Sequence, residues 1–333
     1  MSSYDIAIVG AGFVGSTLAK HLSSSYSVTT FDKNPAPPLL KRIKNVEHKA
    51  CDISNYNEIK EKIGKPKVIL HTAIIQIPAI NQMKNQAYEA NILGTHNICK
   101  FVEETDGISG LILCGSWHVF GEREYGTTID VSFGYRPDKV EERARLYVIS
   151  KMIQEGIVRF YNSMVNEKTY GIIRLGTVLG ENMPEKTAAN IFITNGLQGK
   201  PITPYKHTMH RPMLYVAIND VCKVFQLYID KIIKGYVATG PPDTGIHNLF
   251  YPKPITILDL AQIIKEAITQ QTQGKVTPTI EIIDKRLPIL FSQNEKETLN
   301  VDIRKTKNFF GIKKLKSPKE TIYEIVREKA AKN

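Results

Sequence analysis

The chain has 333 residues, of which 42% are hydrophobic and 23% are charged, and this composition predicts a folded protein with one large α/β domain or two domains. Its longest apolar runs are only of strand length, so we expect no membrane-spanning helix. The formal net charge is +11, but the lysines are dispersed and no basic motif is interleaved with aromatic residues. We therefore expect no nucleic-acid binding, whereas a phosphate-bearing ligand would fit the charge.

The first five residues are polar and lead directly into a predicted strand, without a basic-then-apolar signal segment. The four cysteines share no metal-ligand or redox spacing, so reduced thiols and no metal site are expected. Together these features predict a cytoplasmic location. The cysteines are Cys51, Cys99, Cys114 and Cys222.

Short β-rich runs alternate with amphipathic stretches through the first half of the chain. This alternation is typical of a parallel sheet that is covered by helices. The predicted strands are residues 6–9, 28–31, 46–50, 68–70, 111–114 and 170–175. The predicted helices are residues 16–22, 88–103, 146–161, 257–267 and 319–329.

A glycine-rich loop follows the first predicted strand and reads Gly10-Ala-Gly12-Phe-Val-Gly15. A Gly-x-Gly-x-x-Gly pattern between a strand and a helix is typical of a Rossmann dinucleotide-binding unit. Gly10 permits the tight turn, Gly12 lets the backbone approach a pyrophosphate, and Gly15 allows close helix–strand packing. The helix N-terminus, including Phe13 and Val14, then offers N–H groups and a positive dipole end to the phosphates.

An acidic residue, Asp32, closes the second predicted strand, where a ribose-binding carboxylate is expected. Its carboxylate would accept hydrogen bonds from both ribose hydroxyls and would repel a 2′-phosphate. This favours NAD over NADP as the cofactor. The neighbouring Lys33 weakens the preference, because a cation there could tolerate the phosphate.

Tyr147 and Lys151 are separated by one helical turn in a predicted helix. Side chains at i and i+4 share a helix face. Because a nearby positive charge favours the phenolate, we expect Lys151 to lower the pKa of Tyr147 and to make it a general base. The spacing also arises often by chance, as a pair on a helix surface.

Taken in order, these motifs resemble the extended short-chain dehydrogenase/reductase family. The resemblance is to its NAD-dependent epimerase/dehydratase group, which includes UDP-galactose 4-epimerase. It implies an α/β fold with a Rossmann-type doubly wound parallel sheet and a smaller C-terminal α/β substrate domain. Further matching segments are residues 51–53, 70–73, 91–97, 115–121, 174–180 and 211–221.

The resemblance assigns further cofactor contacts. Asp52 and Ile53 correspond to the family's pair at the adenine ring, and Thr72 and Ala73 to a segment that lines the cofactor. Asn91 is grouped with these residues, although an anchoring role on the backbone is more expected for it.

The resemblance also assigns the catalytic group. Ser116 occupies the position of the family's catalytic Ser/Thr, where its hydroxyl would bond the reacting oxygen and relay a proton to Tyr147. Lys151 would also bond the nicotinamide ribose. In this scheme Tyr147 takes a proton from a sugar hydroxyl while the carbon gives hydride to NAD⁺, and hydride returns to the other face of a 4-keto intermediate.

The implied function is therefore that of an NAD-dependent nucleotide-sugar 4-epimerase. An NAD-dependent dehydrogenase or reductase with net redox turnover shares the first step and stays open as an alternative. A third alternative is a non-enzymatic cofactor sensor or scaffold on the same fold.

The substrate side departs from the family pattern. The 4,6-dehydratases carry an Asp-Glu pair where this chain has Trp117 and His118, which disfavours that chemistry. His118 could act as an acid/base or could serve binding or packing, and Trp117 could stack on a ligand or fill the wall of the site. Thr177 replaces an asparagine that contacts substrate in the family. Arg211 matches a diphosphate-binding arginine, and Arg286 is a weaker second candidate.

The resemblance also implies the domain organisation and assembly. We expect an interleaved division, with the substrate domain closing over the carboxyl ends of the strands. A homodimer would form through the helices predicted over residues 88–103 and 146–161. The NAD-binding domain would comprise residues 1–176 and about 212–247, and the substrate domain about 177–211 and 248–333.

Overall fold

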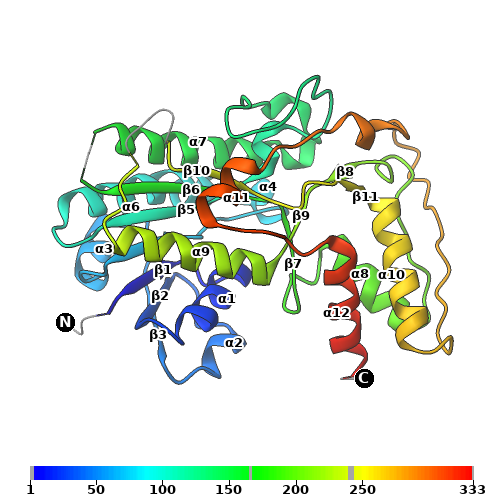
Figure 1. The fold of residues 1–333 in the computed structure, drawn as a ribbon, viewed down its shortest axis with the longest axis horizontal. Coiled ribbons are helices and arrows are strands. Elements are labelled where there is room, and N and C mark those ends of the chain that lie inside the picture. The colour runs from blue at the N-terminus through cyan, green and yellow to red at the C-terminus, as the bar shows by residue number, and fades with distance from the viewer. Residues whose placement is uncertain (1–3, 165–166, 239–243, 332–333) are drawn as a thin grey trace. The chain divides into compact units, whose positions relative to one another are not determined.

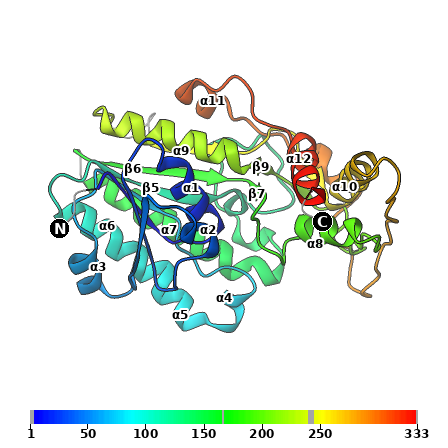
Figure 2. The same ribbon diagram turned by 90° about the horizontal axis from the view of Figure 1, so that it is seen from below.

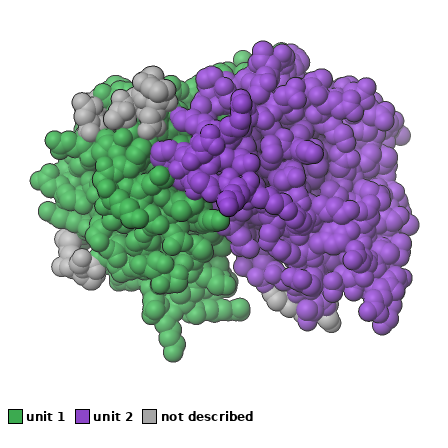
Figure 3. All heavy atoms as spheres, viewed as in Figure 1, with its two compact units in different colours: residues 1–119, 134–174, 221–248 green, residues 120–133, 175–220, 249–333 purple. Residues whose placement is uncertain are grey.

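The computed structural model describes residues 4–164, 167–238 and 244–331. The chain divides into two compact units, which are coloured separately in Figure 3. Unit 1 comprises Met1–Val119, Gly134–Arg174 and Val221–Asn248, and unit 2 comprises Phe120–Phe133, Leu175–Asp220 and Leu249–Asn333.

A seven-stranded sheet forms the centre of unit 1, with the strand order β10-β6-β5-β4-β1-β2-β3 (Figure 1). The pairings β1–β2, β1–β4, β2–β3 and β4–β5 are all parallel. This sheet confirms the predicted Rossmann-type fold. Its strands are β1 (Ile6–Val9), β2 (Val28–Asp32), β3 (Val46–Ala50), β4 (Val68–His71), β5 (Gly110–Ser116), β6 (Thr169–Leu175) and β10 (Ile246–Leu249).

Helices cover both faces of this sheet, with α3, α6 and α7 on one face and α1 and α9 on the other (Figure 2). On the first face, Ile69, Leu111 and Ile172 of the strands pack with Ile98 of α6 and Val158 of α7. Burial of these alternate strand residues explains why the runs fold as strands. The helices are α1 (Phe13–Leu22), α2 (Pro38–Lys41), α3 (Tyr56–Lys62), α4 (Ala79–Gln82), α5 (Lys84–Tyr88), η1 (Glu89–Leu93), α6 (Gly94–Glu104), η2 (Trp117–Phe120), η3 (Pro137–Lys139), α7 (Glu142–Met164) and α9 (Ile218–Ile233).

The single helix predicted over residues 88–103 is instead built from α5, the π-helical turn η1 and α6. Asn91 lies in the π-helical turn, and its amide binds the backbone of Ile75 in the loop after β4. A π turn is a local widening of a helix and often marks a functional region. The sequence periodicity did not reveal it because the contact with Ile75 is tertiary.

Unit 2 contains two small sheets and a group of helices. In one sheet β7 (Thr177–Leu179) pairs in parallel with β9 (Tyr215–Ala217), and in the other β8 (Pro212–Met213) pairs antiparallel with β11 (Ile255–Thr256). Helix α10 packs against α8 and α12, and capping boxes at Thr256 and Ser317 fix where α10 and α12 begin. The helices are α8 (Ala188–Leu197), α10 (Ile257–Gln271), η4 (Glu295–Thr298), α11 (Arg304–Phe310) and α12 (Pro318–Ala330).

Two segments fall outside the expected domain boundaries. Phe120–Phe133 groups with unit 2, where Ile129 forms a β-bridge with Val301. Residues 212–220 also group with unit 2, because β9 pairs with β7. Both assignments depend on pairings between distant segments of the chain.

Candidate active site

The glycine loop after β1 has three glycines in three different environments. Gly10 has a φ of +99°, and a Cβ on it would lie 2.4 Å from the backbone nitrogen of Ala73. A Cβ on Gly15 would lie 1.9 Å from the carbonyl oxygen of Gly10. A Cβ on Gly12 would meet nothing within 4 Å. Gly10 and Gly15 are therefore required by the fold, whereas Gly12 leaves open space in front of the loop.

Helix α1 begins at Phe13 directly behind this open space. Its N-cap, Gly12, makes no side-chain cap hydrogen bond, and its first turn contains no acidic residue. The first N–H groups of a helix have no acceptor within the helix and carry the positive end of its dipole. The loop and the first turn of α1 therefore fit the pyrophosphate of a dinucleotide, as the sequence pattern predicts.

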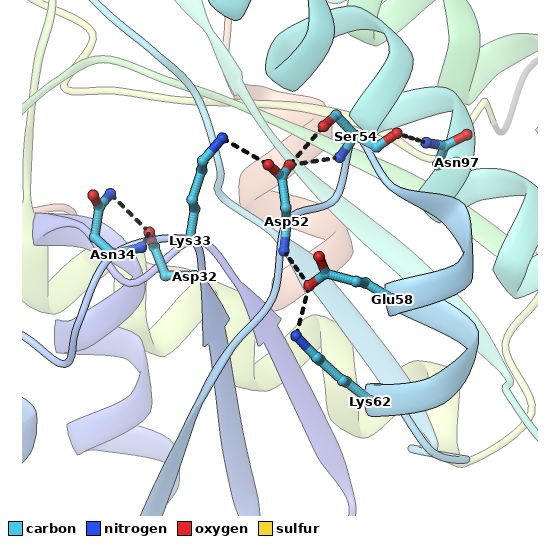
Figure 4. Close-up of polar contacts among 8 residues, drawn as sticks. All are labelled: Asp32, Lys33, Asn34, Asp52, Ser54, Glu58, Lys62 and Asn97. Atoms are coloured by element: carbon cyan, nitrogen blue, oxygen red, sulfur yellow. Dashed lines mark hydrogen bonds and ion pairs between the residues drawn. The ribbon is translucent and has the colours of Figure 1, made fainter.

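The carboxylate of Asp32 is fixed at the end of β2. Its Oδ2 accepts a hydrogen bond of 2.7 Å from the N–H of Ala11, which braces the glycine loop. Its Oδ1 accepts bonds from the backbone N–H and the side-chain amide of Asn34, at 2.9 and 3.0 Å, as Figure 4 shows for the side chain. The structure thus holds this carboxylate at the loop, where a ribose-binding residue is expected.

Lys33 forms an ion pair with Asp52, with 2.7 Å between Nζ and Oδ2 (Figure 4). Asp52 Oδ1 also accepts hydrogen bonds from the backbone N–H and the hydroxyl of Ser54. Burial opposes ionisation of Asp52, but the Lys33 ammonium and the Ser54 bonds prevail and lower its pKa. The Lys33 side chain is 73% exposed, so this surface ion pair is weak and the expected preference for NAD rests on Asp32.

Ile53 belongs to the buried core beside this ion pair. The side-chain amide of Asn97 donates to the carbonyl oxygens of Ile53 and Ser54, at 2.9 and 3.1 Å. Glu58 accepts from the N–H of Asp52 and pairs with Lys62 (Figure 4). These contacts fix the segment that the resemblance places at the adenine ring.

Thr72 and Ala73 follow β4 and pack directly on the glycine loop. The hydroxyl of Thr72 donates to the carbonyl oxygen of Gly10 at 2.7 Å. The same hydroxyl would lie 2.7 Å from a Cβ on Gly15. Thr72 and Ala73 therefore hold the glycine loop in its conformation.

Asn91 is fully buried, and its amide is committed to the backbone. Its Oδ1 accepts from the N–H of Ile75 at 2.7 Å, and its Nδ2 donates to the carbonyl oxygen of Ile75 at 3.0 Å. A weaker contact of 3.4 Å reaches the hydroxyl of Ser150. Asn91 thus anchors the loop after β4 through both atoms of its amide.

The structure brings the three expected catalytic residues together. Ser116 is the last residue of β5, and its hydroxyl hydrogen-bonds the phenol of Tyr147 on α7. Lys151, also on α7, donates from Nζ to the carbonyl oxygen of Cys114 at 2.8 Å. All of these groups lie at the carboxyl end of a parallel strand, where open α/β sheets bind ligands.

The pKa values of this group differ from the sequence expectation. Burial raises the pKa of Tyr147 to about 12, and the hydrogen bond from Ser116 opposes this only in part. Burial also lowers the pKa of Lys151. The expected lowering of the tyrosine pKa by Lys151 is therefore wrong for the protein alone, because desolvation of the phenolate outweighs the nearby cation.

His118 belongs to this catalytic group as well. Its Nδ1 lies 3.2 Å from Ser116 Oγ, and its backbone N–H donates to the same oxygen at 3.3 Å. Its ring meets the Tyr147 ring edge-on, with centroids 6.0 Å apart. Trp117 is fully buried, with its ring centroid 4.4 Å from that of His118, so it packs in the wall of the site.

The sequence pattern gave no sign of a buried polar network around His71, which lies close enough to Lys151 to sense its charge. His71, at the end of β4, bonds through Nε2 to the hydroxyl of Thr95 at 2.8 Å, and Gln154 donates to that hydroxyl at 3.0 Å. Burial lowers the pKa of His71 to about 3, and the charge of Lys151 adds to this effect. The segment containing His71 matched the family, but the pattern gave no signal of the contact with Thr95.

A buried ion pair joins α7 to β6. Arg174 Nε donates to Glu155 Oε2 at 2.9 Å, and both side chains are almost fully buried. The hydroxyl of Tyr135 donates to Glu155 Oε1 at 2.8 Å. The ion pair links α7, which carries Tyr147 and Lys151, to β6. The Tyr135 bond links α7 to the loop that precedes it.

The remaining expected substrate residues lie in unit 2. Thr177 begins β7 and donates its N–H to the carbonyl oxygen of Leu214. Arg211 faces the buried Glu122, with 3.8 Å between Nη1 and Oε1. Arg286 is exposed and has a positive φ of 56°.

Metal ligands and membrane-spanning segments are absent from the residues that the structure describes. Among them, no group of His, Cys, Asp and Glu side chains could hold a metal ion. Over the same residues, no helix is long and apolar enough to cross a membrane. All four cysteines are free thiols.

Comparison with known proteins agrees with this fold. A family model described as the NAD dependent epimerase/dehydratase family matches residues 6–237. The chain therefore belongs to this NAD-dependent family, and NAD is the cofactor that the glycine loop and Asp32 indicate.

Two curated relatives have names that describe different reactions. UDP-glucuronate 4-epimerase 5 of Arabidopsis thaliana is 25% identical over 225 residues, which cover 63% of this chain and 50% of the relative. UDP-glucuronic acid decarboxylase 1 of Danio rerio is 24% identical over 312 residues, which cover 91% of this chain and 66% of the relative. The chain thus matches only half to two thirds of the length of these relatives.

Solved structures share the fold over nearly the whole chain. The UDP-glucose 4-epimerase of Thermus thermophilus, in complex with NAD, has a TM-score of 0.76 at 18% identity and covers 97% of each chain. The dTDP-glucose 4,6-dehydratase of Bacillus anthracis, also in complex with NAD, has a TM-score of 0.76 at 18% identity and covers 99% of this chain and 97% of that one. At these identities the likeness shows the fold alone.

Proposed function

We propose that the chain is an NAD-dependent nucleotide-sugar epimerase that inverts C4 of the sugar through a 4-keto intermediate. The observation that carries this proposal is the grouping of Ser116, Tyr147 and Lys151 at the end of β5 and on α7. The names of the relatives support the substrate class, since they include a UDP-glucuronate 4-epimerase. The alternative of a sensor or scaffold lacks support, because all three catalytic residues are present.

In this proposal, different residues of unit 1 bind the cofactor and act on the sugar. Gly12 and the first turn of α1 would hold the pyrophosphate of NAD, and Asp32 would hold its ribose. When bound, NAD supplies the hydride acceptor at the sugar carbon. Ser116 orients the reacting sugar hydroxyl, and the Tyr147 oxygen receives its proton. Lys151, fixed by the Cys114 carbonyl, is placed to bond the nicotinamide ribose.

The residues that follow Ser116 favour epimerisation over elimination. A 4,6-dehydratase would need carboxylates at these positions to remove a proton and a hydroxyl. This chain has the buried Trp117 and the half-buried His118 there. We therefore assign no dehydratase step, although one solved structure with the same fold carries that name.

We also propose a homodimer through the α5–α6 and α7 helices. Large apolar side chains on these elements are exposed in the single chain, with Tyr88 at 56%, Leu93 at 42% and Phe160 at 61% exposure. Exposed apolar side chains gathered on neighbouring helices are typical of an interface. In unit 2, Arg211 remains the proposed contact to a sugar-nucleotide diphosphate, with Arg286 and Thr177 as weaker candidates.

The test is turnover of a panel that contains UDP-glucose and UDP-glucuronic acid, with NAD supplied. We expect C4 inversion of at least one sugar, and loss of about 100-fold or more in Tyr147→Phe, because general acid–base catalysis contributes about 10²- to 10⁴-fold. Tyr161→Phe is the matched control, since Tyr161 is a buried tyrosine on the same helix that bonds His96 instead. Wild-type rates in Tyr147→Phe would contradict the proposal.

A net dehydrogenase is the second candidate. It is favoured by viral relatives named 3 beta-hydroxysteroid dehydrogenase/Delta 5-->4-isomerase, including that of Monkeypox virus, which is 26% identical over 168 residues. The match covers 47% of this chain and 45% of that one. Such an enzyme would release NADH and a ketone, whereas an epimerase would return the hydride.

A further inference from the structure

The carboxylate of Asp32 is held by the protein on both of its oxygens. Its Oδ1 accepts from the backbone N–H and the side-chain amide of Asn34, and its Oδ2 accepts from the N–H of Ala11. An ionised carboxylate offers about four acceptor positions. Within the described part of the chain, these three bonds leave one position, on Oδ2, for a ribose hydroxyl. The direction of that position is therefore set by the protein bonds to Asn34 and Ala11.

Asn34 is held in turn by His48, which lies on the neighbouring strand β3. His48 is opposite Thr30 in the β2–β3 register, and its Nδ1 lies 2.9 Å from the hydroxyl of Thr30. Its Nε2 lies 3.0 Å from the carbonyl oxygen of Asn34. Because a carbonyl oxygen can only accept, Nε2 carries the proton of this bond. The half-buried imidazole therefore joins the buried Thr30 of β2 to the exposed turn that follows the same strand.

We propose that His48 is a positioning residue for the cofactor. Through Asn34 it fixes the orientation of the Asp32 carboxylate, and with it the preference of the site for NAD over NADP. The hydrogen bonds run without a break from His48 to Asn34, from Asn34 to Asp32, and from Asp32 to Ala11 in the glycine loop. This inference concerns cofactor binding and is independent of the reaction proposed at the sugar.

The preference depends on where the Asp32 carboxylate points. An aligned carboxylate accepts a hydrogen bond from a ribose hydroxyl and repels a phosphate at the same position. Asn34 is exposed and lies beyond the last residue of β2, so the pairing of β2 with β3 does not hold it. Without the bond from His48, Asn34 and the carboxylate should occupy several orientations. NAD would then lose an aligned acceptor, and NADP would meet a charge that can turn away.

The test is calorimetric titration of the full chain with NAD and with NADP, in the absence of any sugar. His48→Leu removes both ring bonds. We expect its Kd for NAD to rise roughly threefold to tenfold, as for the loss of one hydrogen bond, and its Kd for NADP to stay the same or fall. The ratio of the NADP Kd to the NAD Kd should therefore decrease.

Two further variants serve as rescue and control. The amide of His48→Gln can still donate to the Asn34 carbonyl, so this variant should retain most of the wild-type ratio. His21→Leu removes a histidine bond to Gln226, which joins α1 to α9 in the same unit, and should leave the ratio unchanged. A purely structural role of His48 would lower stability and would weaken NAD and NADP binding equally, which would overturn the proposal.

Asp32→Asn shows whether His48 acts through the carboxylate. In this background His48→Leu should not change the ratio further, because no charge is left to orient. A wild-type ratio in His48→Leu, or the same change of ratio in the Asp32→Asn background, would also overturn the proposal. If His48→Leu does not fold, Thr30→Val decides the question. It removes the bond to Nδ1 and should lower the ratio by a smaller amount, and an unchanged ratio would refute the role of His48.

Discussion

Two buried titratable side chains, His71 and Lys151, and the partly buried Tyr147 lie near one another in unit 1, and desolvation shifts the pKa of each toward the neutral form. A charged form in such a place loses more solvation than one neighbouring charge restores. Without bound ligands, the structure therefore fixes the positions of Tyr147 and Lys151 but does not lower the pKa of Tyr147. In the proposed mechanism, the charges of the bound ligands would complete the proton transfer.

His71 predicts a measurable pH dependence of stability. Unfolded His71 binds a proton below about pH 6.5, whereas in the folded state its pKa is lowered to about 3. Between these values the unfolded state binds more protons, so the free energy of unfolding falls by about 1.4 kcal/mol for each pH unit of acidification.

His71→Gln should remove this contribution. From pH 7 to pH 5, its free energy of unfolding, measured with urea, should fall by about 2 kcal/mol less than that of the wild type. The exposed His21→Asn should follow the wild type. An identical pH dependence in His71→Gln and the wild type would show that His71 is protonated in the folded state.

At the scale of the element, alanine substitutions at two glycines of the loop before α1 should affect different properties of the protein. Gly15→Ala should affect stability, and Gly12→Ala should affect NAD binding. Gly15→Ala places a Cβ 1.9 Å from the Gly10 carbonyl oxygen, and Gly12→Ala places one in open space. We expect Gly15→Ala to lower the melting temperature by several degrees, because overpacking costs about 1–3 kcal/mol.

Gly12→Ala should leave the melting temperature nearly unchanged and should weaken NAD binding by roughly tenfold or more, since Gly12 lets the backbone approach the pyrophosphate. Differential scanning fluorimetry and calorimetric titration with NAD measure the two effects. Equal NAD affinity in Gly12→Ala and the wild type would place the pyrophosphate elsewhere.

The ion pair of Glu155 and Arg174 joins α7 to β6, and removal of one partner leaves the other charge buried. Arg174→Met should therefore destabilise the protein by about 3–5 kcal/mol. The double variant Glu155→Leu/Arg174→Met should recover most of that loss. Urea unfolding of the two single variants and the double variant measures this coupling, and additive losses would contradict it.

Local sequence patterns predicted the elements that local forces determine. The strands over Ile6–Val9 and Val46–Ala50 match their predicted bounds, and the glycine loop lies between a strand and a helix as its pattern requires. The π turn at Asn91 and the network of His71 were not predictable, because each depends on a partner that is distant in the chain. The raised pKa of Tyr147 was missed because burial is a property of the folded protein.

At the scale of the whole molecule, the proposed catalytic and cofactor residues all belong to unit 1, and the candidates for substrate recognition, Thr177, Arg211 and Arg286, belong to unit 2. Unit 1 is also the part in which the motifs match the family most fully.

The fate of the hydride tests the central claim most directly. The protein is mixed with equimolar NAD and a UDP-sugar from the panel, NADH absorbance is recorded, and the configuration at C4 is followed by NMR. We predict inversion at C4 with no accumulation of NADH, and loss of inversion in Tyr147→Phe. Stoichiometric NADH released with a ketone product would contradict the epimerase and establish a dehydrogenase.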